Sequence, residues 1–389
     1  MGDAVRRPAW AEWNREGAGA PWTVGVEEEV MLLDPATWMP ASRSEEALGT
    51  LAPEIAGHTS AETHGSAVEL ATDPHPTVSE VVHQLAGLRR GLAETLRELG
   101  LAGAVAGTHP MATWRDTEVS PGARYQFLYA SMRELARREP TFALHVHVAV
   151  PDEAAAIRAY NGVREHLPVL LALSANSPFW QGRDSGLASS RVPVFDVFPR
   201  TGTPRRFETY DEYVEAVDVL LRCNAIPEPT FLWWDVRLQP ALGTIEVRIM
   251  DAQTRVRDTA TLVALVQSLV RREALEGTTE HGSTAHEVLE ENRFLAARDG
   301  TRAELLVPSR GYCVPFADLL APIIRACAPH AQWLRCMPEL AAADALAKRT
   351  GAARQRTIAQ RPEGLHGVLS AMHSDFVSSN SESAEPVGV

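Results

Sequence analysis

Three consecutive glutamates in an otherwise apolar stretch constrain the fold of this chain more than any other feature. Residues 23–34 read TVGVEEEVMLLD, and valines and leucines surround Glu27, Glu28 and Glu29. The β-branched residues predict a strand, whose successive side chains point to opposite faces. Glu27 and Glu29 should share one face, about 6.6 Å apart at Cβ, and Glu28 should point to the other. At an effective dielectric constant of 20 two such charges repel by roughly 2–3 kcal/mol, so their face needs water or a cation.

The same pattern recurs in three later segments. Glu69 stands in the small apolar strand AVELA, and His145 and His147 share one face of FALHVHVAV. In GTIEVRIMD, Glu246 and Arg248 share one face while isoleucine and valine occupy the other. If these four strands belong to one sheet, one face of that sheet gathers Glu27, Glu29, Glu69, His145, His147, Glu246 and Arg248.

Such a face offers carboxylate oxygens and imidazoles but no thiolate, a set that favours Mg²⁺ or Mn²⁺. Cations held there would leave coordination positions for phosphate oxygens, and Arg248 could neutralise a transferring phosphoryl group. Each segment alone has a plainer interpretation: solvated glutamates, hydrogen-bonded histidines, and a Glu246–Arg248 ion pair worth under about 1 kcal/mol. The recurrence across four strands favours a site.

The order of predicted elements indicates an α+β fold, a largely antiparallel β-sheet flanked by helices. Residues 1–21 should form an irregular lead-in, residues 22–372 one domain that is rich in helices from about 258, and residues 373–389 a disordered tail. The predicted strands span 22–34, 67–71, 101–110, 142–150 and a hairpin over 233–251. The predicted helices span 45–55, 77–99, 125–138, 153–173, 210–222 and 258–275, with several more to about 372.

Composition excludes several classes of function. The formal net charge of −13 argues against nucleic acid or an anionic membrane as partner. The four cysteines form no CxxC pair, which argues against a disulfide framework and indicates a reducing cytoplasm. We expect no signal peptide, no membrane span and no P-loop, and hence a cytoplasmic protein.

Several motifs in order resemble a known family. These are GVEEE, ALHVHVAV, LSANSPFWQGRDSGLASSR, WWDVRLQPALGTIEVR, ENRFLAARDG and GAARQR, from about Trp22 to beyond Arg356. Together they resemble the carboxylate–amine ligases, the bacterial glutamate–cysteine ligase type 2 proteins or YbdK group. The resemblance implies a glutamine synthetase-like catalytic sheet that uses ATP and Mg²⁺ or Mn²⁺, and a homodimer. It also implies that a carboxylate, that of the glutamate side chain, is activated as an acyl phosphate. An amine, cysteine or another amino compound, then gives the amide with ADP and phosphate.

The resemblance also implies roles for individual residues. The metal ligands it implies are Glu27, Glu29, Glu62, Glu69, His145, His147 and Glu246. Arg248 would face the phosphates, Glu246 and Arg248 would contribute to nucleotide binding, and Arg191 would contact substrate or phosphate. Trp180 and Gln181 would line the substrate pocket.

Two other functions stay open at this point. A metal-dependent amide hydrolase could use the same glutamates and histidines to activate water, although hydrolysis does not need Arg248 beside Glu246. A catalytically inactive relative could act as a binding protein. The sequence also departs from the family pattern CGLHVHVGV at Phe142, Ala143 and Ala149, which leaves the identity of the substrates open.

Overall fold

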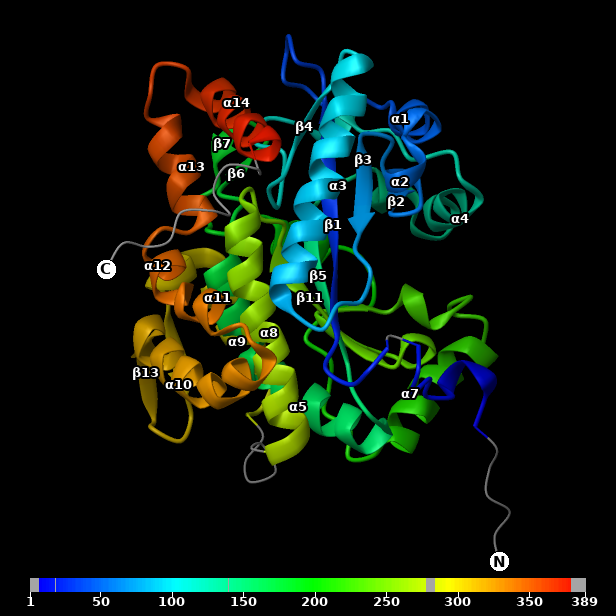
Figure 1. Cartoon of the computed structure of the whole chain (residues 1–389), viewed down its shortest axis with the longest axis vertical. Helices are drawn as coiled ribbons and strands as arrows, with labels where there is room; N and C mark the ends of the chain where they lie inside the picture. Colours follow the sequence, from blue (N-terminus) through cyan, green and yellow to red (C-terminus); the bar gives the residue numbers. More distant parts are fainter. Residues whose placement is uncertain (1–6, 18, 139, 278–283, 379–389) are drawn as a thin grey trace, which may run out of the picture.

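A seven-stranded antiparallel sheet lies at the centre of the computed structural model, which describes residues 7–17, 19–138, 140–277 and 284–378 (Figure 1). The strand order is β10-β11-β5-β1-β3-β2, and β4 pairs with the end of β1. The strands are β1 (Val24–Leu33), β2 (Thr59–Ala61), β3 (Ala67–Ala71), β4 (Ala102–Ala104), β5 (Ala143–Ala149), β10 (Val236–Gln239) and β11 (Thr244–Asp251). The predicted largely antiparallel α+β fold is confirmed.

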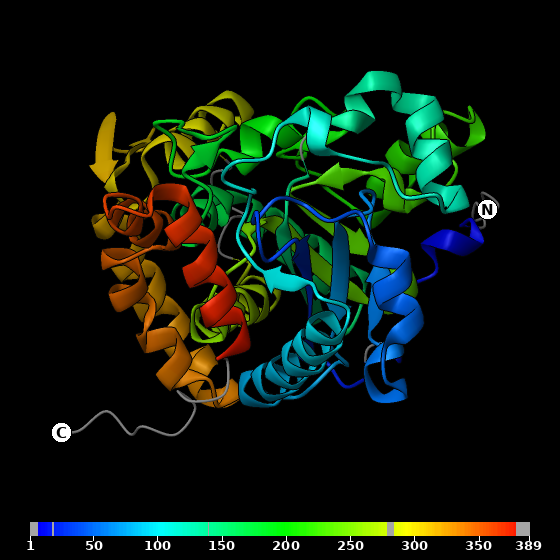
Figure 2. The same ribbon diagram turned by 90° about the horizontal axis from the view of Figure 1, so that it is seen from above.

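Three long helices cover one face of this sheet (Figures 1 and 2). They are α3 (Val78–Glu98), α5 (Glu153–Ser174) and α8 (Val256–Glu276). Helix α3 packs on β1 and β3, α5 on β11, and α8 on β5. The strands turn their aliphatic residues toward these helices; Val26, Val146 and Val247 are buried there. The opposite face of the sheet is therefore left to the polar side chains.

Local sequence explains where α3 begins and which side it buries. Thr77 accepts a hydrogen bond from the backbone N–H of Glu80, and the Glu80 carboxylate accepts one from the backbone N–H of Thr77. This capping box satisfies two backbone donors at the first turn. Leu85, Leu92 and Leu96 are fully buried on the side that faces the sheet, as the helical spacing predicts.

The remaining elements surround this core. The other helices are α1 (Ser44–Thr50), α2 (Pro53–Ala56), α4 (Ala123–Met132), α6 (Arg191–Phe195), α7 (Tyr210–Arg222), α9 (His286–Asp299), α10 (Phe316–Leu334), α11 (Met337–Ala341), α12 (Ala343–Lys348), α13 (Gly351–Ala359) and α14 (Gly364–Val377). Three small two-stranded sheets pair β6 (Phe179–Trp180) with β7 (Arg183–Asp184), β8 (Thr201–Gly202) with β9 (Trp233–Trp234), and β12 (Glu304–Val307) with β13 (Tyr312–Pro315). No described helix combines the length and apolar character needed to cross a bilayer.

The structure corrects one predicted boundary and adds elements that were not predicted. Residues 373–377 belong to α14 and not to a disordered tail, because Met372 and Phe376 are buried. Phe376 packs where Gly103 leaves room: a Cβ at position 103 would lie 2.6 Å from its ring. Residues 379–389 lie outside the described residues. The β12–β13 hairpin falls where only helices are predicted, and α6 lies between the predicted helices 153–173 and 210–222, where no element is predicted.

A buried ion pair fastens α3 to the sheet. Glu28 points to the helical side of β1, where its Oε1 and Oε2 accept hydrogen bonds from Arg89 Nε at 2.7 Å and Nη2 at 2.6 Å. The same guanidinium donates to the carbonyl oxygens of Gln253 and Thr254, which precede α8. Both side chains are fully buried. One arginine therefore holds β1, α3 and the start of α8 together.

We expect Arg89→Met to lower the free energy of unfolding by about 3–5 kcal/mol, because it leaves the Glu28 carboxylate buried without a counter-ion. The double variant Glu28→Leu/Arg89→Met should recover a large part of that loss, since no charge stays buried. Urea unfolding measures both. Arg222→Met, which breaks an exposed ion pair with Glu215, is the matched control and should cost less than about 1 kcal/mol. Equal losses in the Arg89 and Arg222 variants would contradict the assigned role.

Candidate active site

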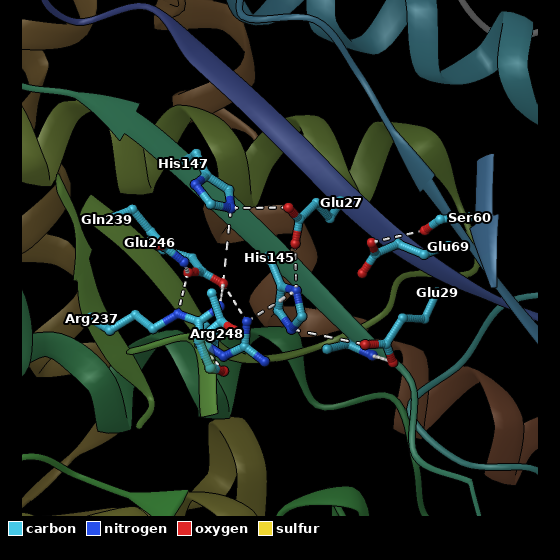
Figure 3. A network of polar contacts seen from close by, with 12 residues as sticks. Glu27, Glu29, Ser60, Glu69, His145, His147, Arg237, Gln239, Glu246 and Arg248 are labelled. Carbon is cyan, nitrogen blue, oxygen red and sulfur yellow. Dashed lines mark hydrogen bonds and ion pairs between the residues drawn. The ribbon is translucent and has the colours of Figure 1, made fainter. Parts of the chain in front are cut away.

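The polar face of the sheet is built from side chains that stand opposite one another on neighbouring strands. Each pair below joins two polar residues of adjacent strands, so the register brings segments far apart in sequence together. The pairs are Glu29 and Glu69 across β1 and β3, Glu27 and His145 across β1 and β5, His147 and Glu246 across β5 and β11, and Glu246 and Arg237 across β11 and β10. Figure 3 shows these side chains converging from β1, β3, β5, β10 and β11.

A cavity of about 570 Å³ opens on this face. Eight of the nine residues proposed as metal ligands or as nucleotide and substrate contacts line it: Glu27, Glu29, Glu62, Glu69, His145, His147, Arg191 and Arg248. Glu246 is fully buried and is not part of the lining. The structure therefore brings the predicted set together, and the roles of its members as ligands and catalysts remain predictions.

Glu27 lies between the two histidines. Its Oε2 is 3.0 Å from His145 Nδ1, and its Oε1 is 3.3 Å from His147 Nε2. Burial opposes ionisation of Glu27, but the charge and hydrogen bonds of the imidazoles outweigh it and hold its pKa below the ordinary value. Burial likewise opposes protonation of His147, and the carboxylates of Glu27 and Glu246 overcome it and raise the pKa of His147. Burial and Arg248 lower the pKa of His145 to about 4, so its imidazole is neutral at pH 7.

Three glutamates next to this centre repel one another. Burial, and then the charge of Glu62, raise the pKa of Glu29 to about 8. Burial together with Glu27, Glu62 and Glu29 raises the pKa of Glu69 well above its ordinary value. Glu29 Oε2 accepts a hydrogen bond of 2.7 Å from the Ala143 backbone N–H, which fixes its position. Without a cation, the Glu29 carboxyl group therefore holds a proton at neutral pH.

Glu246 is surrounded by donors. Arg237 Nε donates to its Oε2 at 2.5 Å, Gln239 Nε2 donates at 2.6 Å, and Arg248 Nη1 donates to its Oε1. Burial opposes its ionisation, but Arg237 and Arg248 outweigh burial and lower the pKa of Glu246 well below the ordinary value. Glu246 therefore stays ionised and holds both guanidinium groups against the cavity.

Two arginines present donors that the protein leaves unused. The Nε atoms of Arg191 and Arg248 are buried and have no hydrogen-bond partner in the described part of the chain. Arg191, at the start of α6, is anchored by the carbonyl oxygens of Ile249 and Arg248 at 3.0 and 3.2 Å. Buried unsatisfied donors are rare in folded proteins and are expected where a ligand completes them. Both groups suit an anion such as a phosphate.

The donor set fits a hard divalent cation. Among the described residues, two groups place three ligand atoms within 4.8 Å of one another: Glu27, His145 and Glu246, and Glu29, Glu69 and His145. Carboxylate oxygens with one neutral imidazole are ligands that Mg²⁺ and Mn²⁺ accept. Glu62 and His147 belong to neither group, although both line the cavity. Glu62 accepts a hydrogen bond from the Thr63 N–H instead.

Sequence reasoning missed Arg237 and Gln239. The signal was present: a hairpin that turns over Pro240–Gly243 places Gln239 opposite Thr244 and Arg237 opposite Glu246. It also missed the outer wall, where Arg124, Tyr125, Leu128, Met132, Phe195, Phe198, Glu228 and Trp233 line the cavity. These segments share no sequence periodicity that would predict that they lie next to the polar face of the sheet. Trp180 and Gln181, proposed for the substrate pocket, are not among the lining residues of the described chain.

The departures from the family pattern lie at the ends of β5. Ala143 and Ala149 share the face of His145 and His147 because the strand alternates. Both alanines and Phe142 are buried. The backbone N–H of Ala143 donates a hydrogen bond to Glu29 Oε2.

Comparison with known proteins gives the family. The model for "Glutamate-cysteine ligase family 2 (GCS2)" matches residues 23–375. A putative glutamate–cysteine ligase 2-1 of Rubrobacter xylanophilus is 38% identical over 341 residues, which are 87% of this chain and 91% of that protein. A putative glutamate–cysteine ligase 2 of Thermobifida fusca is 36% identical over 362 residues, 91% of this chain and 90% of that protein.

Solved structures show the same fold at low sequence identity. The glutamate–cysteine ligase of Francisella tularensis, in complex with AMP, superposes with a TM-score of 0.65 at 12% identity, over 91% of this chain and 89% of that chain. A bifunctional glutathione synthetase from Pasteurella multocida gives a TM-score of 0.66 at 11% identity, over 92% of this chain and 52% of that chain. The family model spans nearly the whole chain and the relatives match along most of their length, so this protein belongs to glutamate–cysteine ligase family 2 and is an ATP-dependent carbon–nitrogen ligase.

Proposed function

We propose that this protein joins the side-chain carboxylate of glutamate to the amine of cysteine or a similar amino compound. A carboxylate oxygen attacks the γ-phosphorus of ATP, ADP leaves, and an acyl phosphate forms. The amine nitrogen then attacks the acyl carbon, the carbon–oxygen bond to phosphate breaks, and the amine loses a proton. The products are an amide, ADP and phosphate.

One observation carries this proposal: two arginines suited to an anion and, apart from the buried Glu246, all members of the two groups of possible metal ligands line a single cavity. A carboxylate and a triphosphate repel each other, so the site that joins them must supply positive charge and hold the reacting atoms in line. Arg191 and Arg248 supply fixed positive charge with unused donors. An amide hydrolase needs no such pair beside its metal ligands, and the family assignment favours ligation.

Carboxylates and His145 would bind divalent cations, and two arginines would stabilise the phosphoryl group. A divalent cation would be held by Glu27, His145 and Glu246 or by Glu29, Glu69 and His145, and the neutral imidazole of His145 would ligate one cation at a time. Bound there, Mg²⁺ or Mn²⁺ would screen the charge of the triphosphate and the acid. Arg248, fixed by Glu246, and Arg191 would stabilise charge on the transferring phosphoryl group.

The adenine base has a candidate recess at one end of the cavity. This recess has a volume of about 190 Å³, and its lining includes Gly25, Val26, Pro74 and Leu242. It shares Glu27, His147 and Leu242 with the catalytic cavity, so a base placed there would direct its phosphates toward the metal ligands. The acid and the amine would then enter from the opposite end, past Glu62 and Tyr125.

The direct test incubates the protein with ATP, Mg²⁺ and a panel of acids and amines, and measures ADP and the amide by mass spectrometry. Ligation predicts ADP release only when both an acid and an amine are present, with one amide formed per ADP. Hydrolysis of an added amide without any use of ATP would favour the hydrolase instead.

We expect Glu27→Gln to reduce turnover at least about 100-fold and Arg248→Lys to lose most activity, because a neutral amide binds cations weakly and an ammonium cannot reproduce the guanidinium fork. Steady-state ADP release measures both. Glu215→Gln and Arg222→Lys, made on the exposed face of α7, change charge or shape in the same way and should leave turnover unaltered. Wild-type rates in Glu27→Gln or Arg248→Lys would remove that residue from the site.

Divalent cation binding should release protons. Because the pKa of Glu29 is about 8, its carboxyl group carries a proton at pH 7 in the metal-free protein, and burial with the neighbouring glutamates shifts the pKa of Glu69 upward as well. A cation competes with those protons, so its affinity should rise from pH 6.5 and level off above about 8. Titration calorimetry with Mn²⁺ in two buffers of different ionisation enthalpy gives the number of protons released per cation bound. The Glu29→Gln variant should release fewer protons than the wild type. A cation affinity that does not change with pH would contradict the assignment of Glu29 and Glu69 as ligands.

Leu242→Asp should raise the KM for ATP at least about tenfold while kcat changes little, because a carboxylate at the recess repels the base and its phosphates. Leu242 is 44% exposed, so the change should not unfold the protein. Leu275→Asp, at a position 54% exposed in α8, is the matched control. A raised KM for the acid with an unchanged KM for ATP would reverse the proposed orientation of the substrates.

A further inference from the structure

A buried arginine lies behind the two arginines that face the catalytic cavity. It is Arg293 of α9 (Figure 1), in the segment ENRFLAARDG, and it is 5% exposed. Its Nε and Nη2 donate to the two carboxylate oxygens of Asp235 at 2.6 and 3.2 Å. Its Nη1 and Nη2 donate to those of Asp196 at 2.6 and 2.8 Å. One guanidinium group therefore binds two carboxylates.

Both carboxylates belong to segments that place the cavity arginines. Asp196 directly follows α6, whose first residue is Arg191. Asp235 lies between β9 and β10, and its carbonyl oxygen accepts a hydrogen bond of 2.8 Å from the backbone N–H of Arg248. Arg293 therefore ties α9 to the segment that carries Arg191 and to the segment that holds Arg248.

The charged side chains surround one small void. Arg191, Arg248, Asp235 and Arg293 line it, and its volume is about 10 Å³, room for about one water molecule. The Asp235 carboxylate is thus near both cavity arginines, yet the hydrogen bonds described for it come from Arg293. The Nε atoms of Arg191 and Arg248 have no partner in the part of the chain that the structure describes.

Asp235 would compete with a phosphate if it were not paired. Burial lowers the pKa of Arg191, and the charges of Asp251 and Asp235 are among those that oppose this shift, so the charge of Asp235 acts on that guanidinium group. Carboxylates and phosphates bind guanidinium groups through the same pairs of parallel hydrogen bonds. Without Arg293, the Asp235 carboxylate would therefore bind Arg191 or Arg248 in place of the phosphate.

Stability alone does not account for this cluster. Packed apolar side chains of similar volume are often as stable as a buried ion pair, because burying the charges costs as much as their attraction returns. The two carboxylates also differ, since the side chain of Asp235 is 7% exposed and that of Asp196 is 34% exposed. Loss of Arg293 would leave Asp196 to water and Asp235 to the nearest guanidinium group.

We infer that Arg293 is a positioning residue, which keeps the Asp235 carboxylate away from the cavity arginines so that their donors bind the phosphates. This inference rests on the proposed function, in which Arg191 and Arg248 stabilise the transferring phosphoryl group. Arg293 acts through its two carboxylates and does not line the catalytic cavity. Its contact with Asp196 also holds the end of α6, from which Arg191 reaches the carbonyl oxygens of β11.

The test measures the affinity of the full-length protein for Mg²⁺–adenylyl imidodiphosphate, an ATP analogue that resists hydrolysis, by titration calorimetry. We expect Arg293→Met to weaken this affinity at least about tenfold. The same change made in an Asp235→Asn protein should weaken it less than about threefold, because the neutral amide does not capture a guanidinium group. Thermal unfolding verifies that each variant is folded at the temperature of the titration.

A matched control separates positioning from stability. Arg354 of α13 forms a buried ion pair with Asp258 of α8, away from both the void and the catalytic cavity. Arg354→Met should lower the unfolding temperature and keep the nucleotide affinity of the wild type. If Arg293→Met fails to fold, Arg293→Lys replaces it, and its ammonium group, which cannot bind both carboxylates in pairs, should weaken the affinity at least about threefold.

The outcomes separate this inference from the proposed function. Wild-type affinity in the Arg293 variants, or an equal loss with Asp and with Asn at position 235, would overturn the inference. An equal loss in Arg354→Met would overturn it as well. Nucleotide binding by a wild-type protein that forms no amide from any acid and amine would contradict the proposed function, and the affinities of the Arg293 variants would still decide the role of this residue.

Discussion

Repulsion among carboxylates on one face of a β-sheet is the constraint on which the rest of this structure depends. The protein offsets it in three ways. Glu27 is held between two imidazoles, and Glu246 is held by Arg237, Gln239 and Arg248. Glu29 has the Ala143 N–H and, at 3.9 Å, His145 Nε2 as partners, and Glu69 has the Ser60 hydroxyl at 3.5 Å; these do not offset burial and the neighbouring glutamates, which raise the pKa of each. A divalent cation would therefore stabilise the region around Glu29 and Glu69 most. In the metal-free protein, the same buried carboxyl groups lower the free energy of unfolding, so the site reduces the stability of the fold.

The antiparallel strand register brings the polar side chains of this face together. Because neighbouring strands place residues directly opposite one another, four cross-strand pairs bring together residues from positions 27 to 246. A slip by one residue would move each glutamate to the opposite face. Glu28 fixes this register from the other side, since its buried pair with Arg89 forms only when Glu27 and Glu29 face the cavity. In β1, Glu27 and Glu29 thus point into the cavity, and Glu28 points to the helical layer and pairs with Arg89.

Much of the fold and site could be predicted from the sequence because strand alternation is a local property. The faces of Glu27, Glu29, His145 and His147 follow from period two alone, and so does the hairpin that carries Glu246. The partner of Glu28 could have been found too, since Arg89 interrupts the apolar stripe of α3. The outer wall of the cavity could not, because Tyr125 and Glu228 reach it through loops and short helices whose placement depends on tertiary packing. The hairpin of β12 and β13 was missed because its strands are only four residues long.

Transfer of oxygen from the acid to phosphate tests the central claim most directly. L-glutamate labelled with ¹⁸O in its side-chain carboxylate would be incubated with the protein, ATP, Mg²⁺ and the amine that supports ADP release, and the phosphate would be analysed by mass spectrometry. An acyl phosphate requires that each phosphate released carries one labelled oxygen, because the carbon–oxygen bond breaks when the amine attacks. Amide formation with unlabelled phosphate would contradict activation of the carboxylate by phosphoryl transfer on this sheet.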